Sequence, residues 1–356
     1  MPLIEMVRDN MTYLIIDSGS SATRLYLVEG KKLLASVKKN VGVSETARTG
    51  SNAALKDCIR ELFEELLVKS GIEEKKIRFA IASGMITSEL GLKIVPHMEA
   101  PAGLRELLNG IEIVQDTQVF PLPMPLMLIR GVKNRCQTSD FLSLLSADLM
   151  RGEEVQAMGV VAHFRNDTLP LNIVELGSTT KLIAIDQDGR ITASATSLSG
   201  QCFAALIKDT LIGKSVEEEP DCPLPQGYFD HKIVDAAIAS VGQSGLLRTL
   251  MLTRFSQLLL HTTWYERRLF LSSAIAADDL MLFSNAADHM GIRMQNPFVL
   301  IGNPDRCKIY EYMFRQVYSP ASIRLITDNR EIDNLVIEGI ACLVEDHVDE
   351  LLQKIS

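Results

Sequence analysis

A short motif occurs twice in the chain, and its recurrence constrains the fold more than any other feature. The first copy is Asp17-Ser18-Gly19-Ser20-Ser21, and the second, Glu175-Leu176-Gly177-Ser178-Thr179, lies 158 residues later (175 − 17). Each copy follows an apolar, strand-like run and precedes a strand, a short turn and another strand. One acid-x-Gly-Ser turn is an ordinary tight turn, but two copies that each open half of the chain predict duplicated α/β domains.

The residue types in both motifs suit a polyphosphate. Gly19 and Gly177 let the backbone approach a ligand, and consecutive N–H groups in such turns form an anion-binding concavity. The neighbouring hydroxyl donors are Ser20, Ser21, Ser178 and Thr179. We expect Asp17 to hold Mg²⁺, which favours one or two carboxylates together with phosphates. Lys181 either offsets phosphate charge as a mobile cation or is an exposed strand lysine.

A third element lies near the C-terminal end of the chain. The apolar run 298–301 leads through Gly302 and Asn303 into a predicted helix. A strand that ends in glycine lets the planar ring of adenosine approach the backbone, although a generic strand-to-helix turn explains the same residues. The chain contains neither G-x-x-x-x-G-K-[ST] nor G-x-G-x-x-G, which argues against P-loop and dinucleotide sites.

Composition narrows the class of protein. The 356 residues carry a net charge of −9, which argues against a general nucleic-acid binder. No apolar run approaches the roughly 18 residues of a membrane span. The six cysteines form no C-x-x-C pair and no zinc-like spacing. We therefore expect reduced, buried thiols in a cytoplasmic protein that uses neither nucleic acid nor a membrane as a partner.

Apolar periodicity indicates where the helices lie. Helical patterns cover 51–70, 139–150 and 153–163, and they dominate 200–290. A closing amphipathic helix is predicted over 331–353. Strands are predicted in each half before these helices, as expected of an α/β chain.

With its three elements in this order, the chain resembles the actin-like ATPase fold of sugar kinases, heat-shock chaperones and actin. Within that fold it is similar to the 2-dehydro-3-deoxygalactonokinase family. The segment Ser83-Gly84-Met85-Ile86-Thr87-Ser88 is similar to the AGMxGS part of a family motif, and 150–156 (MRGEEVQ) matches the family's MRGEExQ. The resemblance covers nearly the whole chain.

The resemblance implies a fold, a domain division and an activity. The fold is α/β, with two actin-like (ribonuclease-H-like) domains, each a mixed sheet with flanking helices, around a central cleft. Residues 1–135 would carry the first phosphate loop. Residues 136–356 would carry the second loop and the adenosine motif, and the final helix would pack back on the N-terminal lobe. The implied activity is ATP-dependent, Mg²⁺-assisted phosphorylation of a hydroxyl on a 2-keto-3-deoxy sugar acid.

The resemblance also places the remaining site residues. Related carbohydrate kinases carry a catalytic aspartate after a glycine at a helix start, and Glu153 and Glu154 occupy that place. We expect Glu153 to be the base, with Glu154 as the alternative, because adjacent carboxylates raise each other's pKa. Arg151 would grip the substrate carboxylate. The sugar side of the site would be lined by Gly84, Met85 and Ser88.

Several positions depart from the family pattern and leave alternatives open. The usual DWGST loop carries Ser18 in place of Trp, the PGTHSKW loop lacks its histidine, and Gln201 replaces the acid of a TGE turn. A catalytically degenerate protein of this fold that binds nucleotide or sugar acid is therefore the second hypothesis. An actin-like hydrolase of phosphoanhydrides is the third. Exposed apolar helices could form a homodimer interface.

Overall fold

The computed structural model describes residues 11–164, 168–345 and 347–355. Its contacts divide the chain into two compact units. Unit 1 contains Met1–Pro170, Ile185–Ala193 and Arg330–Ser356, and unit 2 contains Leu171–Ala184 and Ser194–Asn329. The division into 1–135 and 136–356 stays a prediction. No helix among the described residues combines the length and apolarity that crossing a membrane requires.

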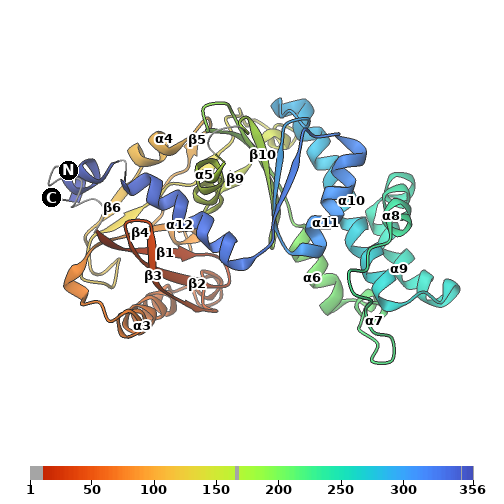
Figure 1. The fold of residues 1–356 in the computed structure, drawn as a ribbon, viewed down its shortest axis with the longest axis horizontal. Helices are drawn as coiled ribbons and strands as arrows, with labels where there is room; N and C mark the ends of the chain where they lie inside the picture. The colour runs from red at the N-terminus through yellow and green to blue at the C-terminus, as the bar shows by residue number, and fades with distance from the viewer. Residues whose placement is uncertain (1–10, 165–167, 346, 356) are drawn as a thin grey trace. The chain divides into compact units, whose positions relative to one another are not determined.

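Unit 1 is built on a six-stranded sheet in the order β3-β2-β1-β4-β7-β6 (Figure 1). The strands are β1 (Thr12–Ser18), β2 (Thr23–Glu29), β3 (Lys32–Lys39), β4 (Ile77–Gly84), β6 (Glu112–Val114) and β7 (Leu126–Leu128). β1, β2 and β3 pair as an antiparallel meander, whereas β4 is parallel to both β1 and β7. The central strand β1 is buried on both faces, as its unbroken apolar sequence predicts.

Helices cover both faces of this sheet. The α3 helix (Ala53–Ser70) buries Leu62, Phe63 and Leu66 in a core shared with β1 and β2, and Figure 1 shows it on the face opposite α12 (Asn329–Glu345). The α12 helix packs closely against α5 (Glu153–His163). Gly159 allows this approach, because a Cβ there would collide with the backbone of α12. The remaining elements of the unit's chain segments are α2 (Ser44–Thr49), η1 (Glu74–Lys76), η2 (Met85–Thr87), β5 (Met98–Glu99), α4 (Leu104–Asn109), β8 (Val132–Lys133), η3 (Ser143–Ser146), β9 (Leu149–Met150) and α13 (Val348–Ile355).

The helix predicted over 139–150 is wrong, because only the short η3 turn and the two-residue strand β9 form there. Asp140 Oδ1 accepts from Ser143 N at 2.8 Å, and Ser143 Oγ accepts from Ser139 N at 2.9 Å. Such local side-chain bonds compete with helical ones. The apolar side chains of Phe141 and Leu142 are exposed rather than packed as a helix face. The predicted closing helix is two helices, α12 and α13.

Unit 2 repeats the strand arrangement, with a five-stranded sheet in the order β12-β11-β10-β13-β14. The strands are β10 (Leu171–Leu176), β11 (Thr180–Ile185), β12 (Ile191–Ser197), β13 (Phe298–Gly302) and β14 (Ile323–Ile326). The order third-second-first-fourth is therefore common to both units, and β10 is parallel to β13 as β1 is to β4. The α/β class predicted from the duplicated motif is confirmed.

Helices dominate the rest of unit 2, as the sequence predicts. They are α6 (Ser199–Asp209), α7 (Leu211–Ser215), α8 (His231–Ser244), α9 (Leu246–Leu260), α10 (Trp264–Met290) and α11 (Pro304–Val317). Figure 1 shows α8 and α9 beyond α10, on the side away from the sheet. The last sheet strands and α11 place Gly302 and Asn303 beside the end of β10, where Leu176 pairs with Gly302.

Candidate functional site

The first loop, residues 19–21, follows β1 and is held mainly through its backbone. Gly19 N donates to Ala22 O at 3.0 Å, while Gly19 O and Ser20 O accept from Val43 N at 3.2 Å and Ser44 N at 3.0 Å. A Cβ on Gly42 would lie 2.5 Å from both carbonyl oxygens, so only glycine lets this segment approach so closely. The loop carbonyls are thus engaged, and the side chains of Ser20 and Ser21 are exposed.

Asp17 lies at the end of β1 beneath this loop. Its Oδ2 pairs with Arg24 Nη1 at 3.1 Å, and its side chain is 22% exposed. Burial raises the pKa of Asp17 more than the Arg24 charge lowers it. On the other side, a Cβ on Gly84 would lie 3.6 Å from Asp17 Oδ1. That oxygen therefore faces a residue without a side chain.

Magnesium is compatible with this carboxylate. Among residues 11–164, 168–345 and 347–355, no three His, Cys, Asp or Glu side chains gather into a metal site. Mg²⁺ commonly takes only one or two protein carboxylates and fills its other positions with phosphate and water. The Asp17 carboxylate, with one oxygen facing Gly84, fits this mode of binding. A metal site made of protein ligands alone would need more such side chains than the described residues bring together.

The two adjacent glutamates differ in their surroundings. Glu154 is 0% exposed, and both carboxylate oxygens accept from Gly152 N, at 2.9 and 2.8 Å. Burial, followed by the charge of Glu153, raises the pKa of Glu154 to about 8. Glu153 is half-buried and its Oε2 accepts from Arg151 N at 2.9 Å. At neutral pH, Glu154 is therefore mostly protonated, and Glu153 is the more accessible of the two.

The Arg151 guanidinium contacts the chain itself. It donates to Thr87 Oγ1 at 2.7 Å and to Val95 O at 2.9 Å, and lies 3.4 Å from His97 Nδ1. These bonds hold the segment that follows Gly84. Ser88 is 2% exposed, and its hydroxyl donates to Met85 O at 2.7 Å, while Met85 is half-buried. Arg151 and Ser88 thus shape the segment that the sequence predicts to line the sugar side.

The predicted unit 1 residues meet where β1 and β4 end. These strands are parallel, with Asp17 opposite Ser83 and Ser18 opposite Gly84. Gly152 lies next to Gly84, because a Cβ on Gly152 would be 3.3 Å from Gly84 Cα. Positive φ angles of 89° at Gly84 and 109° at Gly152 make both turns glycine-dependent. Asp17, the Gly84 segment and the two glutamates therefore share one edge of the sheet.

The second loop, residues 177–179, has the same construction in unit 2. Gly200 lies 23 residues after Gly177, as Gly42 does after Gly19, and a Cβ on Gly200 would collide with the second loop's carbonyls. Ser178 O accepts from Gln201 N at 2.7 Å. The side chain of Ser178 is exposed and that of Thr179 is half-buried. Both loops are therefore cradled by a glycine at the same spacing.

Three other predicted residues surround the second loop. Lys181 is 2% exposed and donates to Thr196 Oγ1 at 2.6 Å, so it is a fixed cation and neither a mobile nor an exposed one. Gly302 has a φ angle of 145°, and a Cβ on it would lie only 2.7 Å from Leu176 O. Glycine therefore allows β13 to end this close to β10. Asn303 Oδ1 caps α11 by accepting from Asp305 N and Arg306 N. Local structure thus requires both residues at this turn, and their role in binding adenosine stays a prediction.

Two neighbouring pockets open beside this turn, and all their lining residues belong to unit 2. The first, of about 210 Å³, lies between α6, α10 and α11 and is lined by Phe203, Asn303 and Arg306 among others. The second, of about 330 Å³, adds Tyr228, Tyr265 and Trp264. Both include Arg268, Ser272, Asp305 and Ile309. The pair offers aromatic and polar walls next to the second loop.

A family model described as 2-keto-3-deoxy-galactonokinase matches residues 17–340. The chain belongs to this family. "Probable 2-dehydro-3-deoxygalactonokinase DgoK1" of Rhizobium meliloti (strain 1021) is 24% identical over 267 residues, 74% of this chain and 77% of that protein. "2-dehydro-3-deoxygalactonokinase" of Escherichia coli (strain K12) is 25% identical over 202 residues, 56% of this chain and 58% of that protein.

Solved structures agree on the fold. The crystal structure of a "putative 2-dehydro-3-deoxygalactonokinase protein" from Sinorhizobium meliloti has a TM-score of 0.69 at 20% identity, covering 94% of this chain and 98% of the other. The activator of the 2-hydroxyisocaproyl-CoA dehydratase from Clostridium difficile, with bound ADPNP, has a TM-score of 0.50 at 12% identity, covering 97% and 98%. The galactonokinase resemblance predicted from the sequence is confirmed.

Sequence reasoning missed three residues of this galactonokinase family member. Arg306 donates to Gly177 O at 2.7 Å and to Thr180 Oγ1 at 2.8 Å. Tyr310 and Asp279 continue this network into the core. Signals for two of them were present. Arg306 stands in the first turn of a helix, where the helix dipole disfavours a cation, and Asp279 continues the apolar i, i+4 series Leu271, Ile275.

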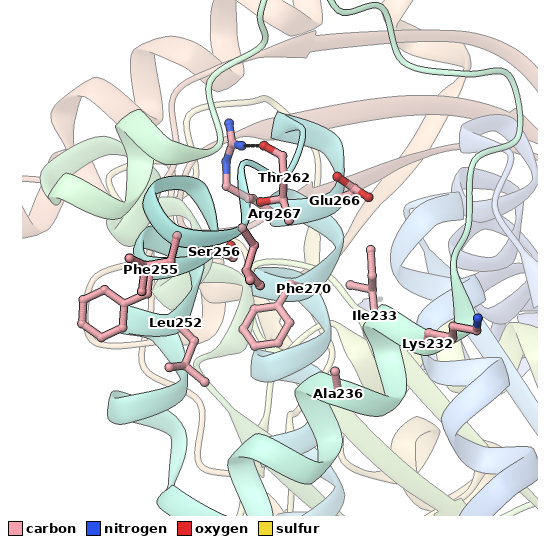
Figure 2. A pocket seen from close by; sticks show the side chains of 12 residues that line it. Lys232, Ile233, Ala236, Leu252, Phe255, Ser256, Thr262, Glu266, Arg267 and Phe270 are labelled. Atoms are coloured by element: carbon pink, nitrogen blue, oxygen red, sulfur yellow. Dashed lines mark hydrogen bonds between the residues drawn. The ribbon is translucent and has the colours of Figure 1, made fainter.

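A third cavity, of about 430 Å³, lies between α8, α9 and α10 (Figure 2). Apolar side chains such as Leu252 and Phe270 line it. Its buried Arg267 donates to Thr262 O and Ser215 O and pairs with Glu219, and Glu266 caps the start of α10. None of the lining residues is a predicted site residue.

Proposed function

We propose that the protein is a kinase that transfers the γ-phosphoryl group of ATP to a hydroxyl of a 2-keto-3-deoxy sugar acid. The observation that carries the proposal is the duplicated loop, in which residues 19–21 and 177–179 each present backbone amides and hydroxyls beside a glycine cradle. Such turns bind anions. One such loop in each unit is what a member of a sugar-acid kinase family that uses ATP would carry.

The nucleotide would be held largely by unit 2. We place its phosphates at the second loop and its adenosine in the pockets beside Asn303. The aromatic side chains of Tyr228 and Tyr265 offer flat surfaces for a base there. Lys181 would add a fixed positive charge behind the loop. Asp17 would hold Mg²⁺, which would supply charge neutralisation at the phosphates.

The acceptor would lie at the edge shared by Gly84 and Gly152. Glu153 would accept the proton of the attacking hydroxyl as the oxygen bonds to the γ-phosphorus and ADP departs. Glu154 is less suited to this role at neutral pH because it is buried and its pKa is about 8. Arg151, Met85 and Ser88 would shape the sugar pocket, since the Arg151 guanidinium bonds Thr87, which lies between Met85 and Ser88. The same guanidinium would meet the substrate carboxylate.

The deciding experiment measures ADP release with Mg·ATP and a panel of 2-keto-3-deoxy sugar acids, including 2-dehydro-3-deoxy-galactonate. We expect release that depends on one of these acids. ADP binding without turnover on any acid would instead indicate the degenerate binding protein, and phosphate release without an acceptor would indicate a hydrolase. Either result refutes the kinase proposal.

The finer expectations belong to the same proposal. A kinase of a small metabolite would work in the cytoplasm, where ATP is supplied. A homodimer is the further expectation, since α9 exposes Leu247 at 82%, Leu259 at 75% and Leu260 at 72%. Sedimentation velocity over a hundredfold range of protein concentration tests it, and a concentration-independent monomer would refute it.

A further inference from the structure

The two loops differ in the group that holds their first carbonyl, and in the second loop that group is a side chain distant in sequence. In the first loop, both carbonyls, Gly19 O and Ser20 O, accept from the backbone N–H groups of Val43 and Ser44. In the second loop, Ser178 O accepts from a backbone N–H, that of Gln201, whereas Gly177 O accepts from the guanidinium of Arg306 at 2.7 Å. A side chain from α11 therefore does in unit 2 what a backbone amide does in unit 1.

This bond fixes the direction of an amide that would face the ligand. A peptide unit is planar and trans, so its C=O and N–H point in opposite directions. When Arg306 holds Gly177 O toward α11, the N–H of Ser178 must point away from α11. The same reasoning applies to Ser178 O and the N–H of Thr179. Both amides of the second loop are therefore oriented before any phosphate arrives.

The guanidinium is itself anchored by a polarised chain of hydroxyls. Arg306 donates to Thr180 Oγ1 at 2.8 Å, which leaves the Thr180 proton for Tyr310 Oη at 3.4 Å. Tyr310 in turn donates to Asp279. Burial raises the pKa of the Tyr310 hydroxyl, followed by the charge of Asp279, so the hydroxyl keeps the proton that it donates. The chain therefore runs in one direction, from cation to carboxylate.

Asp279 ends this chain in the core of unit 2. It is 1% exposed, and its Oδ1 accepts from Ser197 Oγ and Ser199 Oγ, each at 2.5 Å. These serines stand at the end of β12 and the start of α6, next to Gly200 and Gln201, which brace the same loop. One buried carboxylate thus connects both supports of the second loop.

We propose that Arg306, anchored through Thr180, Tyr310 and Asp279, is a positioning residue that sets the amides of the second phosphate loop for nucleotide binding. The inference deepens the proposed function and rests on it only for the identity of the ligand. A lysine cannot replace this arginine, because the ammonium group lacks the planar fork that reaches two acceptors at once.

Four variants and two matched controls test the proposal. Arg306→Lys, Arg306→Gln, Thr180→Val and Tyr310→Phe interrupt the chain at three residues. Arg315→Lys and Tyr312→Phe change the same residue types on α11, at the exposed Glu311 ion pair and the exposed Asp235 hydrogen bond. The measurements are ADP affinity by titration calorimetry, the KM values for ATP and for the sugar acid, and hydrogen exchange of the loop amides.

We expect Arg306→Lys and Arg306→Gln to weaken ADP binding and raise the KM for ATP about tenfold, the usual effect of a lost charged hydrogen bond. The KM for the sugar acid should change less than twofold. Amides of 177–180 should exchange faster, whereas those of 19–21 should not, since Arg306 donates to Gly177 O and Thr180 Oγ1. Thr180→Val and Tyr310→Phe should give smaller changes of the same kind, and the control variants none.

Equal ATP KM values and equal exchange in wild type and Arg306→Gln would overturn the inference. So would faster exchange in both loops, which would mean general destabilisation. The exchange comparison needs no ligand. If wild type binds no ADP, the proposed function fails, while selective exchange at 177–180 still supports the positioning role. If wild type is active and the variants match it, only the positioning role fails.

Discussion

Replacement of Glu154 by glutamine should make the protein more stable at alkaline pH, and the size of the effect follows from its burial. The carboxyl is 0% exposed, and its pKa rises from 4.5 to about 8 on folding. Between these values the folded state holds a proton that the unfolded state has lost. The contribution of Glu154 is therefore most favourable below pH 4.5, and it is lost as the pH rises through 8.

The magnitude is large for one side chain. Each pH unit in this window costs about 1.4 kcal/mol of the free energy of unfolding, so the full window corresponds to about 5 kcal/mol. Glutamine cannot ionise, and its amide oxygen can still accept from Gly152 N. Glu154→Gln should thus match wild type near pH 5 and exceed it by several kcal/mol at pH 9.

Urea unfolding followed by far-ultraviolet circular dichroism at pH 5, 6, 7, 8 and 9 measures this difference. Glu64→Gln, an exposed glutamate on α3, is the matched control and should run parallel to wild type. The informative quantity is the difference between wild type and variant, because it cancels the titration of every other group. If Glu154→Gln also runs parallel to wild type, the carboxyl is not held protonated in the folded protein and the reasoning is refuted.

Three further predictions concern the site. Glu153→Gln should abolish ADP release while leaving ADP binding within twofold of wild type, and full turnover by this variant would eliminate Glu153 as the base. Gly42→Ala should destabilise the protein by about 1–3 kcal/mol, the usual cost of overpacking, because the new Cβ would lie 2.5 Å from each of two carbonyl oxygens. Its control is Gly242→Ala, which has open space on α8 and should be neutral or stabilising. Thermal denaturation measures both variants. Asp279→Asn should weaken ADP binding severalfold without altering the sugar-acid KM, and a change confined to the sugar-acid KM would contradict the network.

The duplicated motif was readable because each copy is local. Five consecutive residues after an apolar run identify the strand and the turn. The sheets of both units place the strand before the motif between the second and fourth strands. The glycine cradles extend the repeat, at 23 residues after Gly19 and Gly177, and a search for equal spacings could have found them. Turn chemistry of this kind depends on near neighbours, which a single sequence displays.

The rest of the site depends on contacts between distant residues. Arg306 meets Gly177 across 129 positions, and Arg151 meets Thr87 across 64. No periodicity in one sequence reports such pairs. The same limit explains why the sequence does not show what holds the side chains of Arg151 and Lys181. Their side chains are held by Thr87 and Thr196, which only the fold brings near.

The departures from the family pattern fall on side chains, whereas the anion-binding capacity of the loops resides in the backbone. Gln201 replaces an acid, yet the bond that braces the second loop comes from its backbone N–H and does not depend on the side chain. The family's histidine is absent from this loop, but Arg306 brings a permanent positive charge to Gly177 O. A loop whose amides are oriented by Gly200, Gln201 and Arg306 keeps the donors that a phosphate needs. We therefore expect the substitutions that distinguish this chain from the family pattern to leave the proposed phosphate scaffold complete and to act on substrate preference.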